Sequence, residues 1–184
     1  MSSHKMGRRD FLTAGLLTAT ACLFPFESVA AAARFLSPDR ALSFYNAHTG
    51  ENMKTVYWQE GAYLPQALAD INYILRDYRT GEVKEIDIAL LDLLFSLLQS
   101  LESPGPFHVI SGYRSQKTNS LLRFINRGVV KDSLHIEGKA IDIRLPGREL
   151  TTVRNFATGL QRGGVGYYPF ADFVHLDVGR IRYW

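Results

Sequence analysis

The sequence predicts an α+β fold in which a mainly antiparallel sheet packs against helices. Helical patterns dominate the first half of the chain, and short strand patterns separated by tight turns dominate the second half. Of the 184 residues, 46% are hydrophobic and 21% are charged, a balance typical of a globular protein with a proper core. These observations together predict one domain, over residues 41–184, preceded by an N-terminal appendage.

The first elements of this domain are a hairpin and two helices. Residues 41–58 alternate like two strands around a turn at residues 48–51. Residues 87–101 predict a helix that begins at the N-cap Asp87, is apolar on most faces and lies at the centre of the core. Residues 64–79 predict the other helix, because apolar side chains recur there at helical spacing, at Leu64, Leu68, Ile71, Leu75 and Tyr78.

Shorter elements follow a break at residues 103–106, where proline and glycine interrupt the pattern. An amphipathic helix is expected over residues 147–164, closed by Gly163 and Gly164. The other expected elements are a buried strand running into a loop over 107–115, a helix over 116–127, a strand over 139–146, and strands over 165–169 and 172–184.

The N-terminal appendage has the pattern of an export signal. The pair Arg8 and Arg9 precedes an apolar run over residues 12–26 and the small-residue stretch 28–30, which suits signal cleavage. The apolar run is too short to span a bilayer with comfort. We therefore predict that residues 1–30 are a twin-arginine signal peptide, with no stable membrane span after cleavage.

This signal implies a partner and a compartment. The twin-arginine translocation machinery is the expected partner, the periplasm is the expected location, and residues 31–40 are expected to form a linker. An alternative makes Cys22 the site of a lipid anchor. It is favoured less, because Ala19 occupies the position where such a site has leucine.

Charge and cysteine content narrow the function classes. The net charge of +3 comes without a run of lysine or arginine, so we expect no nucleic-acid partner. Cys22 is the one cysteine and falls in the predicted signal, so the exported domain can form no disulfide within itself. Any metal site in that domain must therefore use histidine and carboxylate ligands.

Strand alternation suggests where such a site lies. Asp142 has the opposite parity to its apolar neighbours Ile141 and Ile143, and His175 has the opposite parity to Val174 and Leu176. If the two strands are neighbours, both polar side chains lie on one surface, over which His135 can fold from the turn at Gly138. Two histidines and one carboxylate suit a catalytic zinc site. A solvated polar strand face would alternate in the same way, so spacing alone leaves both interpretations open.

Three motifs resemble a known family. "SLHIEGKAID" matches the pattern S-x-H-x-x-G-x-A-x-D of the D-Ala-D-Ala metallopeptidase superfamily, "DFVHLD" resembles its downstream histidine motif, and "SGYRS" resembles its upstream tyrosine-arginine motif. "GGVGYYP", "FVHLDVG" and the twin-arginine leader resemble the murein endopeptidase K branch. The resemblance covers about residues 41–184 and implies the zinc site on the sheet face that this superfamily shares.

The resemblance implies one Zn²⁺ per chain, bound by His135, Asp142 and His175 with water as the fourth ligand. The implied activity is that of a zinc-dependent murein endopeptidase, which hydrolyses the cross-links between peptidoglycan stem peptides during cell wall remodelling. Two alternatives remain: a D,D-carboxypeptidase or dipeptidase acting on the stem peptide, and a zinc-bearing wall-binding module without catalysis.

Three further residues are catalytic candidates. Asp172 stands three residues before His175, where relatives often have an acid, and Asp177 stands two residues after it on the same strand face. We favour Asp177 as the indispensable acid, either as general base or as the partner of a histidine. Arg114 is expected to donate hydrogen bonds to the oxyanion or to a substrate carboxylate. His108 and His48 are expected to lie outside the metal site.

Overall fold

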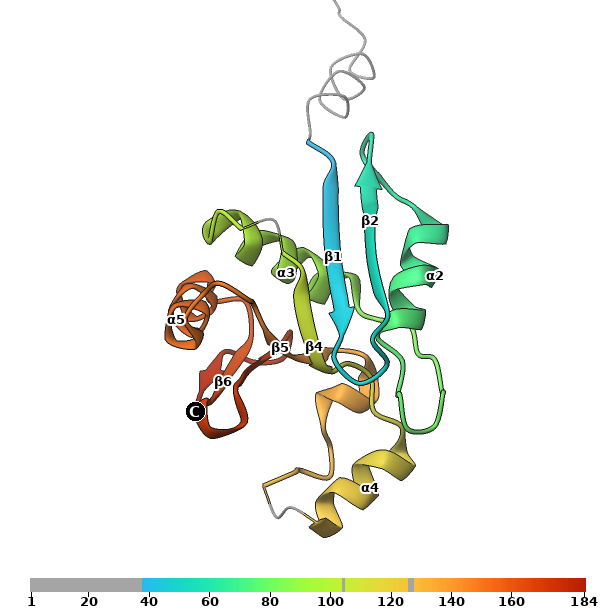
Figure 1. The fold of residues 1–184 in the computed structure, drawn as a ribbon, viewed down its shortest axis with the longest axis vertical. Helices are drawn as coiled ribbons and strands as arrows, with labels where there is room; N and C mark the ends of the chain where they lie inside the picture. The colour runs from blue at the N-terminus through green and yellow to red at the C-terminus, as the bar shows by residue number, and fades with distance from the viewer. Residues whose placement is uncertain (1–37, 104, 126–127) are drawn as a thin grey trace, which may run out of the picture.

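One mixed sheet of eight strands runs through the described part of the chain (Figure 1). The computed structural model describes residues 38–103, 105–125 and 128–184. The strand order is β3-β2-β1-β4-β5-β7-β6-β8, and all pairs in it are antiparallel except β1–β4 and β6–β8. The strands are β1 (Arg40–Asn46), β2 (Asn52–Gln59), β3 (Ala62–Tyr63), β4 (Phe107–Ser111), β5 (Ala140–Arg144), β6 (Gly164–Tyr168), β7 (Phe173–Asp177) and β8 (Arg182–Tyr183). The predicted α+β class with a mainly antiparallel sheet is confirmed.

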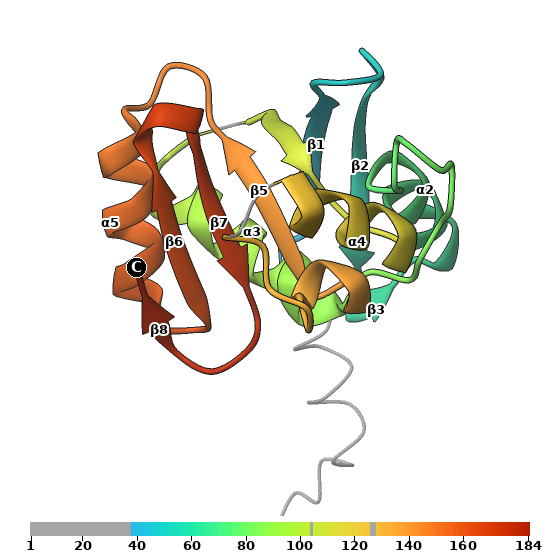
Figure 2. The same ribbon diagram turned by 90° about the horizontal axis from the view of Figure 1, so that it is seen from below.

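Helices lie on both faces of this sheet. α3 and α5 pack together on one face, whereas α4 and the short 3-10 turn at residues 134–137 lie across the other (Figure 2). The α-helices of the described residues are α2 (Pro65–Ile74), α3 (Ile88–Ser100), α4 (Gln116–Ile125) and α5 (Leu150–Leu160). None of these helices has the length and apolar character needed to cross a membrane.

α3 is the central helix of the core, as predicted. Asp87 caps its first turn by accepting a hydrogen bond from the backbone N–H of Ala89 at 2.9 Å. Its buried side chains pack against the apolar face of the sheet; they are Leu90, Leu91, Leu93, Leu94, Leu97 and Leu98. Burying that many leucines is the main stabilisation of this layer, at about 1.5–3 kcal/mol for each side chain.

Two helix boundaries differ from the prediction. α2 ends at Ile74, so Tyr78 lies in the following turn and not on the helix. The chain turns there because the buried Asp77 bonds Ser115, far along the sequence, at 2.7 Å. α5 ends at Leu160, with Gln161 in the left-handed conformation at φ 50°, so Gly163 and Gly164 do not close it.

Most other boundaries agree with the sequence to within a few residues, but the strand predicted over 172–184 is divided into β7 and β8 by a bend at residues 178–181. The hairpin β1–β2 forms, with β1 beginning at Arg40 inside the predicted linker. β3 and the 3-10 turn at residues 134–137 have no counterpart in the prediction. The predicted signal peptide, its cleavage site and Cys22 lie outside the described residues.

Candidate metal centre

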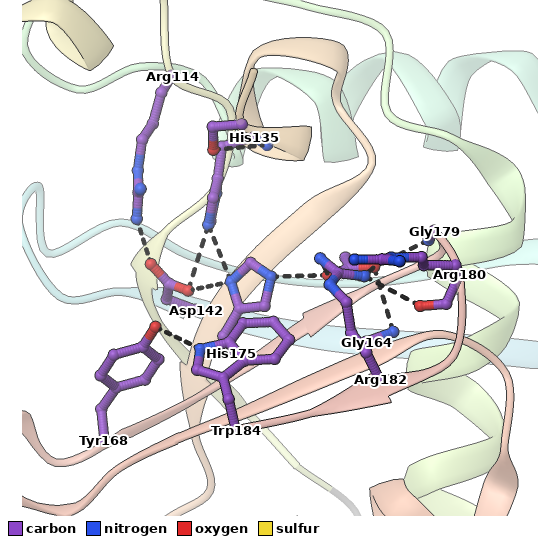
Figure 3. A network of polar contacts seen from close by, with 12 residues as sticks. Arg114, His135, Asp142, Gly164, Tyr168, His175, Gly179, Arg180, Arg182 and Trp184 are labelled. Carbon is purple, nitrogen blue, oxygen red and sulfur yellow. Dashed lines mark hydrogen bonds and ion pairs between the residues drawn. The ribbon is translucent and has the colours of Figure 1, made fainter. Parts of the chain in front are cut away.

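His135, Asp142 and His175 converge on one point (Figure 3). The Nε2 atom of His135 lies 3.2 Å from the Oδ1 atom of Asp142 and 3.2 Å from the Nδ1 atom of His175. The last two atoms lie 2.8 Å apart. The structure therefore brings together the three residues that the sequence offered as metal ligands.

Strand register explains how Asp142 and His175 meet. β5 and β7 are antiparallel neighbours, and Asp142 is paired directly with His175. Ile141, Ile143 and the neighbouring residues of β7 point into the core from the other face, as the alternation predicted. Asp142 is nevertheless only 3% exposed, because the turn that contains His135 covers it. A solvated polar strand face is thereby excluded at this position.

The 3-10 turn places His135 over the sheet, and its sequence shows why. Ser133 precedes the turn and caps it, since its hydroxyl accepts the backbone N–H of His135 at 3.4 Å. Gly138 ends the turn at φ 71°, and a Cβ there would meet the carbonyl oxygen of Glu85 at 2.3 Å. In the Ser-x-His-x-x-Gly pattern, the serine therefore caps the turn, the histidine is the candidate ligand, and the glycine permits close packing against residue 85.

Hydrogen bonds on the outer edges of both rings define which nitrogens face the centre. The Nδ1 atom of His135 lies 2.7 Å from the carbonyl oxygen of Gly112, which can only accept, so this nitrogen carries the proton. The Nε2 atom of His175 lies 2.9 Å from the Oδ2 atom of Asp177 and by the same reasoning donates to it. The inner nitrogens of the neutral rings therefore present lone pairs, beside a carboxylate oxygen.

Three acceptor atoms facing one another suit a cation. Ligands at the usual distances of a tetrahedral zinc site are about 3.3 Å apart, close to the separations found here. All three residues line the cavity, and the Oδ2 atom of Asp142 accepts a hydrogen bond from Arg114. The residues present therefore fit a divalent metal ion with an open coordination position.

Electrostatics act differently on the three residues of this group. Burial lowers the pKa of His135, because a charged ring is poorly solvated there. Burial opposes ionisation of Asp142 too, but His135, His175 and Arg114 hold its pKa well below its ordinary range. Burial also disfavours a charge on His175, yet its hydrogen bonds to Asp142 and Asp177 raise its pKa.

Asp177 contacts His175 from the side opposite to Asp142. Its buried carboxylate also accepts hydrogen bonds from the backbone N–H groups of Gly164 and Gly179 and from Arg182, at 2.7–3.2 Å. Burial opposes the charge, but hydrogen bonds from His175, Arg182 and the backbone of Gly179 hold its pKa far below the ordinary value. The carboxylate is thus fully engaged and faces away from the centre of the three ligand atoms.

Asp172 lies elsewhere. It follows the tip of the β6–β7 hairpin at φ 53°, is exposed, and forms an ion pair with Arg144 at 2.7 Å. It does not line the cavity next to the candidate metal centre. Of the two acids that the sequence suggested, only Asp177 therefore contacts a residue of the centre.

The third candidate, Arg114, lies beside the centre. Its guanidinium contacts Asp142 and donates from Nε to the hydroxyl of Ser111 at 2.8 Å. The backbone N–H of Arg114 also bonds the carbonyl oxygen of His135 at 3.1 Å. Gly112 allows this loop to approach α2, because a Cβ there would meet the carbonyl oxygen of Leu75 at 2.4 Å. The "SGYRS" motif therefore contacts two of the three candidate ligands, His135 and Asp142.

A cavity of about 860 Å³ lies over the centre and includes residues that the sequence did not single out. Trp184 lines it with its ring 5.3 Å from that of His175, and its indole N–H donates to the hydroxyl of Tyr168 at 2.7 Å. Gly166 is the sequence signal for Trp184, since a Cβ at that glycine would lie 2.7 Å from the indole ring. Tyr168 also lines the cavity, whereas the neighbouring Tyr167 packs against the core.

The other two histidines in the described part of the chain lie outside the ligand group. His108 is half-buried against Tyr45, with ring centroids 4.7 Å apart. His48 lines the cavity but bonds the carbonyl oxygen of Ile110 through Nε2 at 2.9 Å. Glu137 is exposed and pairs with Lys139 at 2.7 Å.

Comparison with known proteins agrees with these observations. The family model for peptidoglycan L,D-endopeptidase MepK matches residues 35–184. The peptidoglycan L,D-endopeptidase MepK of Escherichia coli strain K12 is 39% identical over 184 residues, which cover all of both chains. The probable peptidoglycan L,D-endopeptidase MepK of Haemophilus influenzae is 37% identical over 185 residues, which cover 100% of this chain and 98% of that one. No solved structure matches at a significant level. The resemblance to the murein endopeptidase K branch is confirmed, and the chain belongs to the peptidoglycan L,D-endopeptidase MepK family.

Proposed function

We propose that this protein is a metal-dependent endopeptidase that cleaves an L,D peptide bond in the cross-linked stem peptides of peptidoglycan. The observation that supports it most is the convergence of three lone-pair atoms from His135, Asp142 and His175 beside an open cavity. Relatives that match the whole chain are named as peptidoglycan L,D-endopeptidases. Their names favour endopeptidase activity over the D,D-carboxypeptidase and dipeptidase alternatives.

Zn²⁺ is the metal that we propose. Two imidazole nitrogens and one carboxylate, with a fourth position open, are the donors of many catalytic zinc sites. Magnesium and calcium prefer sites made of oxygen ligands, and the only oxygen ligand offered here comes from Asp142. When bound, the ion would supply Lewis-acid activation of the scissile carbonyl group and of a water molecule.

The chain's own residues would orient the ligands and the substrate. Asp177 would hold the ring of His175 in the tautomer whose Nδ1 lone pair faces the centre. The carbonyl group of Gly112 would hold His135 in the opposite tautomer, whose Nε2 lone pair faces the centre. These contacts support a positioning role for Asp177 rather than proton transfer, since its oxygens accept from other donors. Arg114 would donate hydrogen bonds to a substrate oxygen next to Asp142.

A peptidoglycan substrate requires that the enzyme acts outside the cytoplasm. The twin arginines Arg8 and Arg9 support export by the twin-arginine route to the periplasm. Both residues lie outside the described part of the chain, so this route rests on the sequence. The lipid anchor at Cys22 remains the alternative.

The direct test is to incubate the metal-loaded protein with purified cross-linked muropeptides and identify the products by mass spectrometry. We expect cross-linked dimers to be converted to monomers by cleavage of an L,D bond. Chelation should abolish this hydrolysis, and added Zn²⁺ should restore it. Full hydrolysis by the metal-free protein would contradict the proposed mechanism.

The same experiment separates the alternatives. Release of a terminal D-alanine from uncross-linked peptides, with dimers left intact, would indicate a D,D-carboxypeptidase. Binding of peptidoglycan without hydrolysis of any substrate would indicate a wall-binding module.

A further inference from the structure

The cavity extends across the sheet well beyond the metal centre. His48 follows the end of β1, Asp142 lies on β5, and His175 and Trp184 lie toward the β8 edge. β4 alone separates β1 from β5, so the His48 end of the cavity lies about 10 Å from Asp142. That length corresponds to about three residues of an extended peptide.

Arg79 lines this distant end of the cavity. Its guanidinium lies 4.2 Å from the ring centroid of Tyr78, and that ring stacks on His48 with centroids 3.8 Å apart. Stacking of this kind restricts where the guanidinium can point. Arg79 thus stacks on Tyr78 at the cavity wall, and Tyr78 in turn stacks on His48.

Arg79 also differs from the other arginines of the cavity in its partners. Arg114 contacts Asp142, and Arg182 pairs with Asp177 at 2.7 Å. None of the ion pairs within residues 38–103, 105–125 and 128–184 involves Arg79. Its donors are therefore available to an anionic group that enters the cavity.

A buried carboxylate ties the loop of Arg79 to the loop of Arg114. Asp77, which is 1% exposed, accepts the backbone N–H of Arg79 at 3.0 Å. It also accepts the backbone N–H and the hydroxyl of Ser115, at 2.9 and 2.7 Å. The position of Arg79 relative to the metal centre is therefore set by hydrogen bonds inside the protein.

We propose that Arg79, supported by Tyr78 and His48, is a binding site for a carboxylate of the substrate, about three residues from the bond that is cleaved. A planar guanidinium recognises a carboxylate through paired hydrogen bonds. This inference rests on the proposed function, and it defines the substrate as an acidic peptide. It also assigns a reason for endopeptidase specificity, since a distant anchor requires a peptide that extends past the scissile bond.

Binding can be measured without turnover, by calorimetric titration of the metal-loaded protein. The ligands are an uncross-linked stem peptide with free carboxylates and the same peptide with every carboxylate converted to a carboxamide. We expect the wild type to bind the acidic peptide about 10- to 100-fold more tightly. Arg79→Gln should lose most of this preference, whereas Arg79→Lys, which keeps the charge but not the paired geometry, should retain more of it.

Arg162→Gln is the matched control. It removes the same charge from an exposed arginine outside the cavity, whose contact is a hydrogen bond to Ser96 at 2.8 Å. This variant should keep the full preference for the acidic peptide. Equal binding of both peptides by the wild type, binding of neither, or a preference that survives Arg79→Gln would each overturn the proposal. Failure of the proposed function is a separate result, namely absence of hydrolysis of cross-linked muropeptides by the wild type.

Discussion

At the residue scale, the metal centre brings three lone-pair atoms together with no hydrogen-bond donor of the neutral side chains between them. The inner nitrogens of His135 and His175 and an oxygen of Asp142 lie 2.8–3.2 Å apart, and their outer partners already use the ring N–H groups. Acceptors held this close together in a buried site repel one another unless a proton or a cation lies between them. Metal binding should therefore relieve an electrostatic cost that the fold itself creates.

Each ligand should consequently be needed for metal binding. We expect His135→Ala, Asp142→Ala and His175→Ala to remain folded, because the core faces of the strands are unchanged. Each should lose more metal affinity than the about 10- to 100-fold typical of an outer hydrogen-bond partner. Zinc content after dialysis, measured by mass spectrometry, provides the test, and His108→Ala is the control. Stoichiometric zinc in any of the three variants would exclude that residue as a ligand.

The two candidate acids should differ in their effect. Asp177→Asn replaces an acceptor of five hydrogen bonds, including that of His175, by a group that is partly a donor. We expect it to lower kcat/KM on a cross-linked muropeptide by about 10- to 100-fold and to weaken zinc binding. Asp172→Asn, which removes an exposed ion pair, should keep near-normal values of both. The reverse order of effects would assign the essential role to Asp172.

At the element scale, close approaches of backbone segments hold the site together. Gly112 lies against the end of α2, and Gly163 lies against β7, where a Cβ would meet the carbonyl oxygen of Asp177 at 1.7 Å. Glycine is required at both positions because backbone atoms, unlike flexible side chains, cannot move aside. The strands and loops of the site are therefore packed more tightly than side chains alone would allow.

Two glycine substitutions should have opposite effects on the free energy of unfolding. Gly112→Ala places a Cβ 2.4 Å from the carbonyl oxygen of Leu75 and should destabilise the protein by about 1–3 kcal/mol. Gly159→Ala, in α5 with no atom within 4 Å of the new Cβ, should stabilise it by about 0.5–1 kcal/mol. Urea unfolding of both variants measures these changes. Similar effects at the two positions would contradict the packing argument.

The turn after α2 should show a pH-dependent contribution from Asp77. Burial opposes the charge on Asp77, but hydrogen bonds from Thr118, Ser115 and the backbone of Arg79 lower its pKa. The folded protein therefore binds this proton more weakly than the unfolded chain does. The stabilisation is complete above about pH 4 and is lost as the pH falls through the lowered pKa.

Asp77→Asn should therefore cost about 1–3 kcal/mol of unfolding free energy at pH 7. The difference from the wild type should narrow as the pH falls below about 4. Urea titrations across this pH range test both statements. Asp70→Asn, an exposed substitution on α2, should change the unfolding free energy little at any pH. If the difference in unfolding free energy between the wild type and Asp77→Asn instead widened as the pH fell, the pKa of Asp77 would be raised and not lowered.

At the scale of the whole molecule, the sheet assembles the site from distant parts of the chain. β4, β5 and β7 are neighbours in space, and β5 meets β7 although Asp142 and His175 are 33 residues apart. α3 and α5 support these strands from behind, so the polar face remains open to the cavity (Figure 2). The site therefore depends on the complete domain.

Export of that domain should depend on the leader. Replacing Arg8 and Arg9 by lysine should retain the protein in the cytoplasm, because the twin-arginine machinery reads this pair. Cell fractionation with immunodetection measures the retention. Mass spectrometry of the exported protein should show a chain beginning near Ala31. A mature chain beginning at a lipid-modified Cys22 would instead establish a membrane anchor.

The sequence by itself determined the features that depend on short-range rules. Alternation along β5 and β7 assigned Asp142 and His175 to the polar face, and Asp87 marked the start of α3, because pleating and capping involve only neighbouring residues. The order of three motifs also led to the correct family. These short-range rules could not predict which strands are neighbours in the sheet.

The tertiary structure alone decided the remaining questions. α2 stops at Ile74 because Asp77 bonds a residue 38 positions away, a contact that helical periodicity does not reveal. Strand parity placed Asp177 next to His175, but only the packing of Gly164, Gly179 and Arg182 around it shows that its oxygens are occupied. Arg79, in the loop after α2, and Trp184, after β8, line one cavity although they are far apart in the sequence. The physical reason is common to all three: local patterns record which way a side chain faces, whereas strand order and loop packing determine what it meets.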